Sequence, residues 1–209
     1  MDRKSGQRPG STLSTAIDRR RLLALLGAVG LAPLVPRPGL AAPATAYLSA
    51  ARLASDRHAA LGLDAAAGRV LHRFDAVAGR HFFGHGFFSP DGRLLYATEN
   101  DFDAEAGAIG IYDAADGWRR VGEIAGVGIE PHEAALLGDG RTIVAADGGI
   151  LTHPDYGREK LNLATMAPAL VYVDRASGEI LETARLDPAL HRLSIRHLAR
   201  DATGAVWFG

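Results

Sequence analysis

Two hairpin patterns recur along this sequence of 209 residues, and their repetition constrains the fold more than any other feature. In the first pattern an apolar stretch ends in Asp, Gly follows four residues later, and a second apolar stretch begins. Asp64, Asp113 and Asp174 open its three copies, at intervals of 49 and 61 residues. Asp accepts hydrogen bonds from nearby backbone N–H groups and Gly adopts positive φ, so each copy is predicted to be a β-hairpin.

The second pattern alternates with the first and has a turn such as Ser-Pro-Asp-Gly at its centre. Phe87–Tyr96 is predicted to form strand, turn and strand, Ala134–Val144 repeats the pattern, and His197–Trp207 begins a third copy. One hairpin of each kind makes a four-stranded antiparallel unit of roughly 48 residues, which is the size of a β-propeller blade.

We therefore expect an all-β fold, a β-propeller. Residues 45–209 would supply about three and a half four-stranded blades, because closed propellers repeat such units around an axis. The second blade would run from about His85 to Ile124, the third from about His132 to Leu186, and a fourth would begin near His197. We expect residues 45–209 to be the N-terminal portion of a longer propeller, which at seven blades would have roughly 340 residues. The alternative is a small open β-sandwich of the same strands.

Residues 1–44 are expected to be a twin-arginine export signal. Arg19–Arg21 precede an apolar run of thirteen residues, Leu22–Leu34, and a small-residue segment ends the leader. Paired arginines, a short apolar run and a small-residue exit are the parts of such a signal. Spanning a bilayer takes roughly 20 apolar residues, so we expect a periplasmic protein with no stable membrane insertion after cleavage. An uncleaved membrane anchor is the alternative.

Charge and composition exclude several classes of function. After residue 44 the chain has 16 basic and 22 acidic residues, which argues against nucleic acid as a partner. Cysteine is absent, which excludes disulfides, thiolate nucleophiles and Cys-ligated zinc or iron–sulfur sites. Histidine, with eight copies, is the main soft metal ligand that remains.

Each predicted innermost strand begins with a histidine, namely His85, His132 and His197. Equivalent positions in successive blades surround the propeller axis at one depth. The repeat therefore predicts a ring of imidazoles at the mouth of the channel. Such a ring could hold a transition metal, with iron, copper and zinc as candidates. In the alternative, each histidine bonds to the neighbouring blade and only holds the ring of blades together.

A long insertion separates two strands of the third blade, from Asp147 to Pro168. Long segments in compact domains are often functional, so we expect this one to close over the channel mouth and bind a small ligand. Its charged and imidazole side chains, together with the carboxylate beside His132, form the predicted ligand-binding set: Glu133, His153, Asp155, Arg158 and Lys160. A solvated segment over the blade edge is the alternative.

A second polar stretch, Glu99–Glu105, has four carboxylates within seven residues. We expect it to be a solvated acidic loop after a strand at Leu94–Thr98, because an isolated acidic run is a weak signal for a site. A calcium or magnesium site is the alternative.

Phe88–Tyr96 followed by Ile109–Asp113 resembles the blades of lactonase-like and quinoprotein-like propellers. The arginine leader, Glu99–Asp101, Pro131-His132-Glu133 and Gly149–Asn162 are similar to an uncharacterised bacterial family of exported propellers. The most specific part of this resemblance is His153–Asn162. Members of that family are often encoded beside imelysin-type proteins linked to iron uptake. The resemblance implies the periplasm and periplasmic iron-uptake proteins as partners, but it carries over no catalytic residue.

We therefore predict a periplasmic propeller that binds a metal or small ligand at its channel mouth, in the service of iron acquisition. Binding is preferred over catalysis. The alternatives are a lactonase-like or cofactor-dependent propeller enzyme and a protein-interaction scaffold. A substrate-sized pocket in which a carboxylate approaches a histidine would favour the enzyme, and a broad exposed apolar patch would favour the scaffold.

Overall fold

The computed structural model describes residues 45–50, 59–64, 69–157 and 159–209. The predicted export signal, residues 1–44, and Arg158 lie outside these described residues. The described part forms thirteen strands and two short 3-10 helices. None of its helices has the length and apolar character needed to cross a membrane.

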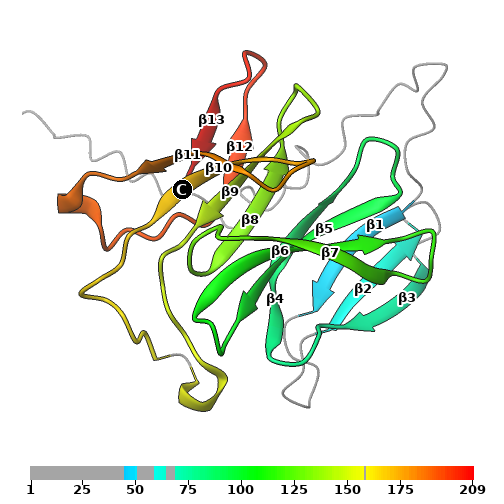
Figure 1. Ribbon diagram of the computed structural model, residues 1–209, viewed down its shortest axis with the longest axis horizontal. Coiled ribbons are helices and arrows are strands. Elements are labelled where there is room, and N and C mark those ends of the chain that lie inside the picture. Colours follow the sequence, from blue (N-terminus) through cyan, green and yellow to red (C-terminus); the bar gives the residue numbers. More distant parts are fainter. Residues whose placement is uncertain (1–44, 51–58, 65–68, 158) are drawn as a thin grey trace, which may run out of the picture. The chain divides into compact units, whose positions relative to one another are not determined.

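Two four-stranded antiparallel sheets form the centre of the described chain (Figure 1). The second blade is β4 (Arg80–Phe88), β5 (Leu94–Asp101), β6 (Ala106–Asp113) and β7 (Arg119–Ala125), paired in chain order. The third blade repeats this order with β8 (Pro131–Leu136), β9 (Thr142–Asp147), β10 (Ala169–Asp174) and β11 (Ile180–Arg185). The prediction of an all-β propeller with four-stranded blades is confirmed.

Smaller sheets lie on either side of these two blades along the chain. Before them, β1 (Thr45–Ala50), β2 (Ala59–Asp64) and β3 (Arg69–Asp75) form a three-stranded antiparallel sheet. After them, β12 (Leu198–Arg200) pairs with β13 (Val206–Phe208). The 3-10 helices are η1 (Pro154–Tyr156), inside the insertion, and η2 (Pro188–Leu190), after the third blade.

An aspartate at the equivalent position in each blade stabilises the turn of the second hairpin and joins that hairpin to the first. Asp113 and Asp174 each accept hydrogen bonds from backbone N–H groups of the turn that follows, through Oδ1. Arg93 Nη2 donates to Asp113 Oδ2 at 2.9 Å, and Arg141 makes the matching bond to Asp174. The Asp of one sequence pattern therefore binds the Arg of the other, which gives both blades the same geometry.

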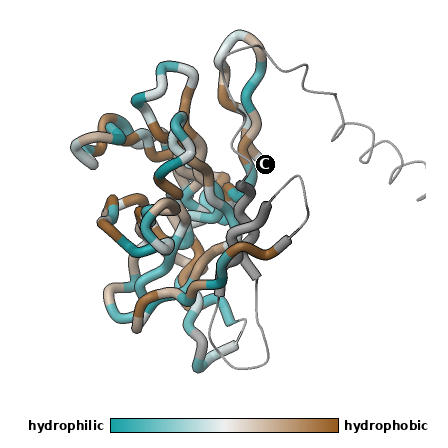
Figure 2. The backbone as a smooth tube through the Cα atoms, turned by 90° about the vertical axis from the view of Figure 1, so that its right-hand side faces the viewer, coloured by the Kyte–Doolittle hydropathy of each residue, from teal (hydrophilic) through white to brown (hydrophobic). Residues whose placement is uncertain are grey.

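The core is a series of layers between successive sheets, because strand residues alternate between the two faces of each blade. An aromatic layer lies between β3 and the second blade: Phe74, Phe82, Tyr112 and Trp118. A mostly aliphatic layer lies between the second and third blades: Tyr96, Ile109, Val127, Ile143 and Val171. A third layer joins the third blade to β12 and β13: Val144, Leu170, Ile195 and Val206. Hydropathy accordingly changes over short distances along the chain (Figure 2).

The prediction of an acidic loop at Glu99–Glu105 was wrong for the first three residues, because β5 continues through Asp101. Residues 102–105 form a turn, and residues 103–105 are exposed. Glu99 is completely buried. Its carboxylate accepts hydrogen bonds from the Tyr112 hydroxyl and from Arg120 Nη2, the latter at 2.9 Å, and Arg80 Nη1 lies 3.5 Å away. Burial first, and then the Glu99 charge, raise the pKa of Tyr112 far above its usual range. Two arginines, one from β4 and one from β7, thus allow an acidic sequence to continue as a buried strand.

A glycine on the next strand leaves the room for this buried carboxylate. A Cβ at Gly110 would overlap Glu99 Oε1, whereas a Cβ at Gly122 on β7 would lie 3.8 Å from its nearest neighbour. We predict that Gly110→Ala lowers the free energy of unfolding by about 3–5 kcal/mol, because Glu99 must leave its partners. Gly122→Ala should change it by less than about 1 kcal/mol. Urea denaturation of both variants measures this, and equal effects would contradict the steric argument.

A second buried carboxylate, Asp147 at the end of β9, joins two segments. Its Oδ1 accepts hydrogen bonds from Ile129 N and Gly149 N, both at 2.9 Å. Burial raises the pKa of Asp147 from 3.8 to about 6. The folded state therefore binds this proton more tightly than the unfolded state. The stability that Asp147 contributes is present below about pH 4 and is lost as the pH rises to about 6.

Asp147→Asn keeps an oxygen that can accept both hydrogen bonds but removes the ionisation. We predict that the variant gains stability relative to the parent protein between about pH 4 and pH 6, by on the order of 3 kcal/mol over that range. Urea denaturation at a series of pH values measures the difference. Parallel stability curves for the two proteins would show that Asp147 does not titrate in this way.

Candidate metal centre

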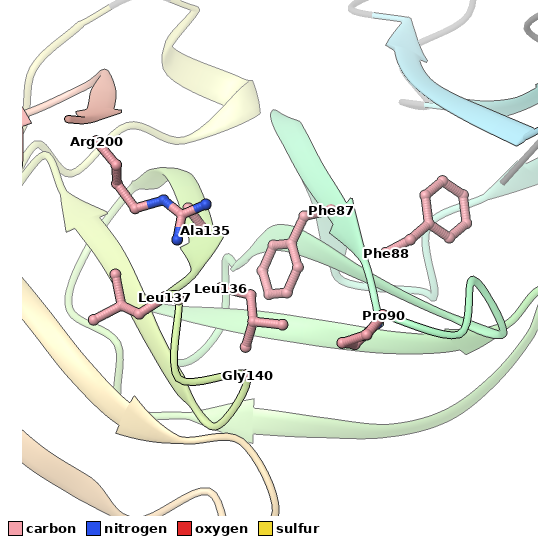
Figure 3. A pocket seen from close by; sticks show the side chains of 9 residues that line it. Phe87, Phe88, Pro90, Ala135, Leu136, Leu137, Gly140 and Arg200 are labelled. Atoms are coloured by element: carbon pink, nitrogen blue, oxygen red, sulfur yellow. The ribbon is translucent and has the colours of Figure 1, made fainter. Parts of the chain in front are cut away.

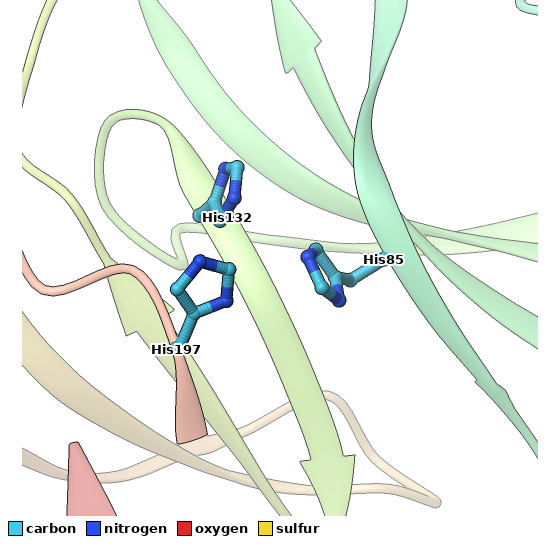
Figure 4. A group of neighbouring side chains, drawn as sticks. All are labelled: His85, His132 and His197. Atoms are coloured by element: carbon cyan, nitrogen blue, oxygen red, sulfur yellow. The ribbon is translucent and has the colours of Figure 1, made fainter. Parts of the chain in front are cut away.

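His85, His132 and His197 come together from three successive sheets (Figure 4). Their ring centroids are 5.0, 5.3 and 5.1 Å apart, so the rings form a nearly equilateral triangle. One ligand nitrogen of each ring lies within 4.8 Å of the other two. The sequence therefore identified residues that the structure brings together, while their role as metal ligands stays a prediction.

Irregular strand pairing directs two of these side chains. The register of β4 and β5 shifts around His85, which follows Gly84 at a φ of 117°, and the register of β8 and β9 shifts at His132. Such bulges turn a side chain away from the regular alternation of the strand. His197 precedes β12, and its backbone N–H donates to Gly209 O at 3.0 Å. The repeat predicted the three positions but not the bulges that orient them.

One hydroxyl holds the backbone of two of the histidines. Thr98 on β5 is completely buried. Its Oγ1 is 3.1 Å from His85 O and 3.2 Å from His132 O, and its single proton is shared between these two carbonyl oxygens. Sequence reasoning missed Thr98, although a polar residue within an apolar strand is a signal that could have drawn attention to it.

Glu133, a predicted ligand-binding residue, lies behind two of the imidazoles. Its Oε2 is 3.4 Å from His197 Nδ1 and its Oε1 is 3.9 Å from His85 Nδ1. Oε2 also accepts a hydrogen bond from Leu198 N at 3.0 Å. A carboxylate beside Nδ1 favours the proton on that nitrogen and leaves Nε2 available to a metal. Glu133 is thus placed to orient metal ligands rather than to act as one.

His132 is held as a neutral imidazole. Burial first, and the Arg196 charge next, lower its pKa to about 4. The neutral form is the one that binds metals. Arg196 Nη2 lies 3.4 Å from His132 Nδ1, and a guanidinium can only donate, so Nδ1 is the acceptor in this contact. Metal binding through Nε2 would require this contact to break and the proton to move to Nδ1.

The insertion places its predicted residues in different surroundings. Asp155 N donates to His153 Nδ1 at 3.2 Å, and the His153 ring packs against Phe102 and Tyr156. Among the described residues, neither His153 nor Asp155 contacts the three histidines. Lys160 instead lines a pocket with residues next to the histidines.

The described part of the structure has two pockets near β4 and β8. The polar pocket, of about 490 Å³, is lined by Glu130, Ile150, Thr152, Gly157, Lys160 and Arg196. Arg196 connects this pocket to His132. The apolar pocket, of about 420 Å³, lies where β4 and β8 end, and Figure 3 shows Phe87 and Leu136 side by side there with Arg200 above. Sequence reasoning missed Glu130 and Arg196, which lie 66 residues apart in the chain.

The sequence of residues 44–209 matches the family described as "Protein of unknown function (DUF1513)", and the chain belongs to this family. A search of curated proteins found no match.

Several solved structures are similar to this chain. The β-propeller domain of the Trilobed protease from Pyrococcus furiosus is 12% identical, with 69% of this chain and 40% of that chain covered and a TM-score of 0.37. The Dos1 propeller is 10% identical, with 74% and 45% covered and a TM-score of 0.39. A protein from Lactobacillus plantarum is 19% identical, with 66% and 38% covered and a TM-score of 0.39. The chain thus spans less than half the length of each, and the blade assignment rests on its own strand pairing.

The Thr98 hydroxyl provides a test of how the histidines are held. We predict that Thr98→Val lowers the free energy of unfolding by about 1–3 kcal/mol, because the carbonyl oxygens of His85 and His132 lose a buried donor. Thr98→Ser keeps the hydroxyl and should lose less than Thr98→Val. Chemical denaturation measures both, and a larger loss in the Ser variant would mean that the Thr98 methyl group matters more than its hydroxyl.

Proposed function

We propose that this propeller binds a transition metal through His85, His132 and His197. The observation that carries the proposal is the convergence of the three imidazoles from three sheets. Neutral imidazole nitrogens suit zinc, copper, iron and nickel. The low pKa of His132, the position of Glu133 behind two rings and the half-exposed state of His85 all support a ligand role over a purely structural one.

The three side chains fit such a metal after a modest movement. Metal–nitrogen bonds of about 2.0–2.1 Å in tetrahedral geometry place ligand nitrogens roughly 3.4 Å apart. The present spread of up to 4.8 Å therefore has to close by about 1.4 Å at most, relative to that spacing. His85 and His197 have side chains that are 36% and 64% exposed, so their rings have room to turn. Three protein ligands would leave a position open for an exchangeable ligand.

We extend the proposal to the compartment and the process in which the protein acts. The resemblance of the arginine leader and of Gly149–Asn162 to exported propellers supports a periplasmic location, reached by the twin-arginine pathway. The same resemblance supports iron acquisition, with periplasmic iron-uptake proteins as partners. On this proposal the open coordination position serves uptake or transfer of the metal.

A metal-assisted hydrolase of the lactonase-like type is the second candidate. The observation that favours it is the carboxylate of Glu133, whose Oε2 is 3.4 Å from His197 Nδ1 beside a three-histidine site. A bound metal with an open position can activate water for attack on an ester. Hydrolysis of a simple lactone by the metal-loaded protein, lost in His132→Ala, would support this candidate.

Metal content of the complete exported protein tests the proposal. We predict one equivalent of iron, copper or zinc in the parent protein, and little in His132→Ala. His191→Ala removes a histidine that bonds to Pro188 O, outside the cluster, and should leave the metal in place. Glu133→Gln should weaken binding about 10–100-fold, because it removes a carboxylate behind two ligands.

Titration of the metal-free proteins completes the test. Absence of metal from the purified parent protein, together with no binding on titration, would refute the proposal. So would unchanged metal binding in His132→Ala. If that variant were merely less stable, the histidines would hold the blades together, as in the alternative derived from the repeats.

A further inference from the structure

We propose that the polar pocket lined by Glu130, Thr152, Lys160 and Arg196 is a binding site for a small hydroxycarboxylate. This site lies beside the three histidines and shares Arg196 with them, but its ligand is recognised by protein side chains alone. The inference therefore goes beyond metal binding and does not depend on it.

The backbone of Glu130 is strained. Its φ is 59°, in the left-handed region that side-chain-bearing residues rarely adopt. The strained segment is held by two backbone hydrogen bonds, from Gly148 N to Glu130 O at 3.0 Å and from Gly149 N to Ile129 O at 2.8 Å. Strain of this kind persists where the surrounding structure enforces it, and it is concentrated at ligand sites.

The Glu130 carboxylate is only half satisfied. The residue is 5% exposed, and its Oε1 accepts a hydrogen bond from Arg196 Nη2 at 2.9 Å. Its Oε2 is buried without a hydrogen-bond partner among the described residues. A buried oxygen in this state is unfavourable, and a ligand that donates a hydrogen bond to it gains affinity. The pocket therefore favours a ligand with a hydroxyl group.

Gly148 packs closely against this oxygen. A Cβ at Gly148 would lie 3.3 Å from Glu130 Oε2 and 2.8 Å from Ser194 Oγ. Within the described chain, the buried Ser194 hydroxyl also lacks a partner. Glycine at position 148 thus lets the backbone approach two unsatisfied polar atoms, and a side chain there would push against Ser194 Oγ.

The charges of the pocket favour an anion. Lys160 and Arg196 contribute two positive charges against the single carboxylate of Glu130. Lys160 is exposed and forms no salt bridge within the described residues, so its ammonium is available to a ligand carboxylate. The Thr152 hydroxyl can donate to the same group. An anion that also donates a hydroxyl satisfies both features, whereas an ammonium group in place of the hydroxyl would add a third positive charge beside Lys160 and Arg196.

Calorimetric titration of the metal-free full chain with malate, succinate and aspartate tests this assignment. These probes have the same carbon skeleton and differ in one group, which is a hydroxyl, a hydrogen or an ammonium. We expect malate to bind and succinate to bind at least tenfold more weakly, because succinate leaves Glu130 Oε2 unpaired. Lys160→Met should weaken malate binding at least tenfold. Lys160→Arg and Arg192→Met, a change at an exposed cation outside the pocket, should retain it.

Three results would overturn the proposal. These are no binding of malate at millimolar concentration, malate binding no tighter than that of succinate or aspartate, and unchanged malate binding in Lys160→Met. Since the titration uses metal-free protein, its failure would leave the three-histidine site untouched, and failure of the metal experiments would leave this pocket untouched.

Discussion

The bond between a turn aspartate and an arginine of the neighbouring hairpin is the constraint that the two four-stranded blades share. Arg93 with Asp113, and Arg141 with Asp174, join the two hairpins of each blade in the same way. Because the same Asp also holds its own turn, one side chain connects the two hairpins of a blade. Two blades built alike then present their innermost strands at the same depth, and this equivalence brings histidines 47 residues apart in sequence to the same place.

Buried polar side chains form hydrogen bonds between segments that the strand pairing does not join. Thr98 ties the backbone at His85 to that at His132 across two blades, and Asp147 holds the segment that leads into β8. Each of these groups has hydrogen-bond partners, as buried polar groups usually do: Thr98 donates to two carbonyl oxygens, and Asp147 accepts from two backbone N–H groups. Glu99 follows the same rule with two arginines and a tyrosine. The backbone near the histidines is therefore held by several buried hydrogen bonds, while the rings of His85 and His197 stay partly exposed.

The parts that could be predicted from the sequence are those that depend on local chemistry at a repeated spacing. Asp and Gly at fixed offsets predicted the hairpins, and equal positions before the turns predicted that His85, His132 and His197 would converge. Burial of Glu99 was not predictable in this way, because its arginine partners are 19 and 21 residues away on other strands. The pocket at Glu130 was missed for a related reason: Arg196 is 66 residues away, and the positive φ of a glutamate has no sequence signature.

Arg196 links the two proposed sites. Its guanidinium is 2.9 Å from Glu130 Oε1 and 3.4 Å from His132 Nδ1, so the carboxylate is its closer partner. A metal on His132 Nε2 would require a proton on Nδ1, and this proton would displace the guanidinium towards the pocket. An anion in the pocket would attract the same guanidinium and release Nδ1. Each ligand would then favour the arrangement that the other requires, and by thermodynamic linkage each would raise the affinity for the other by the same factor.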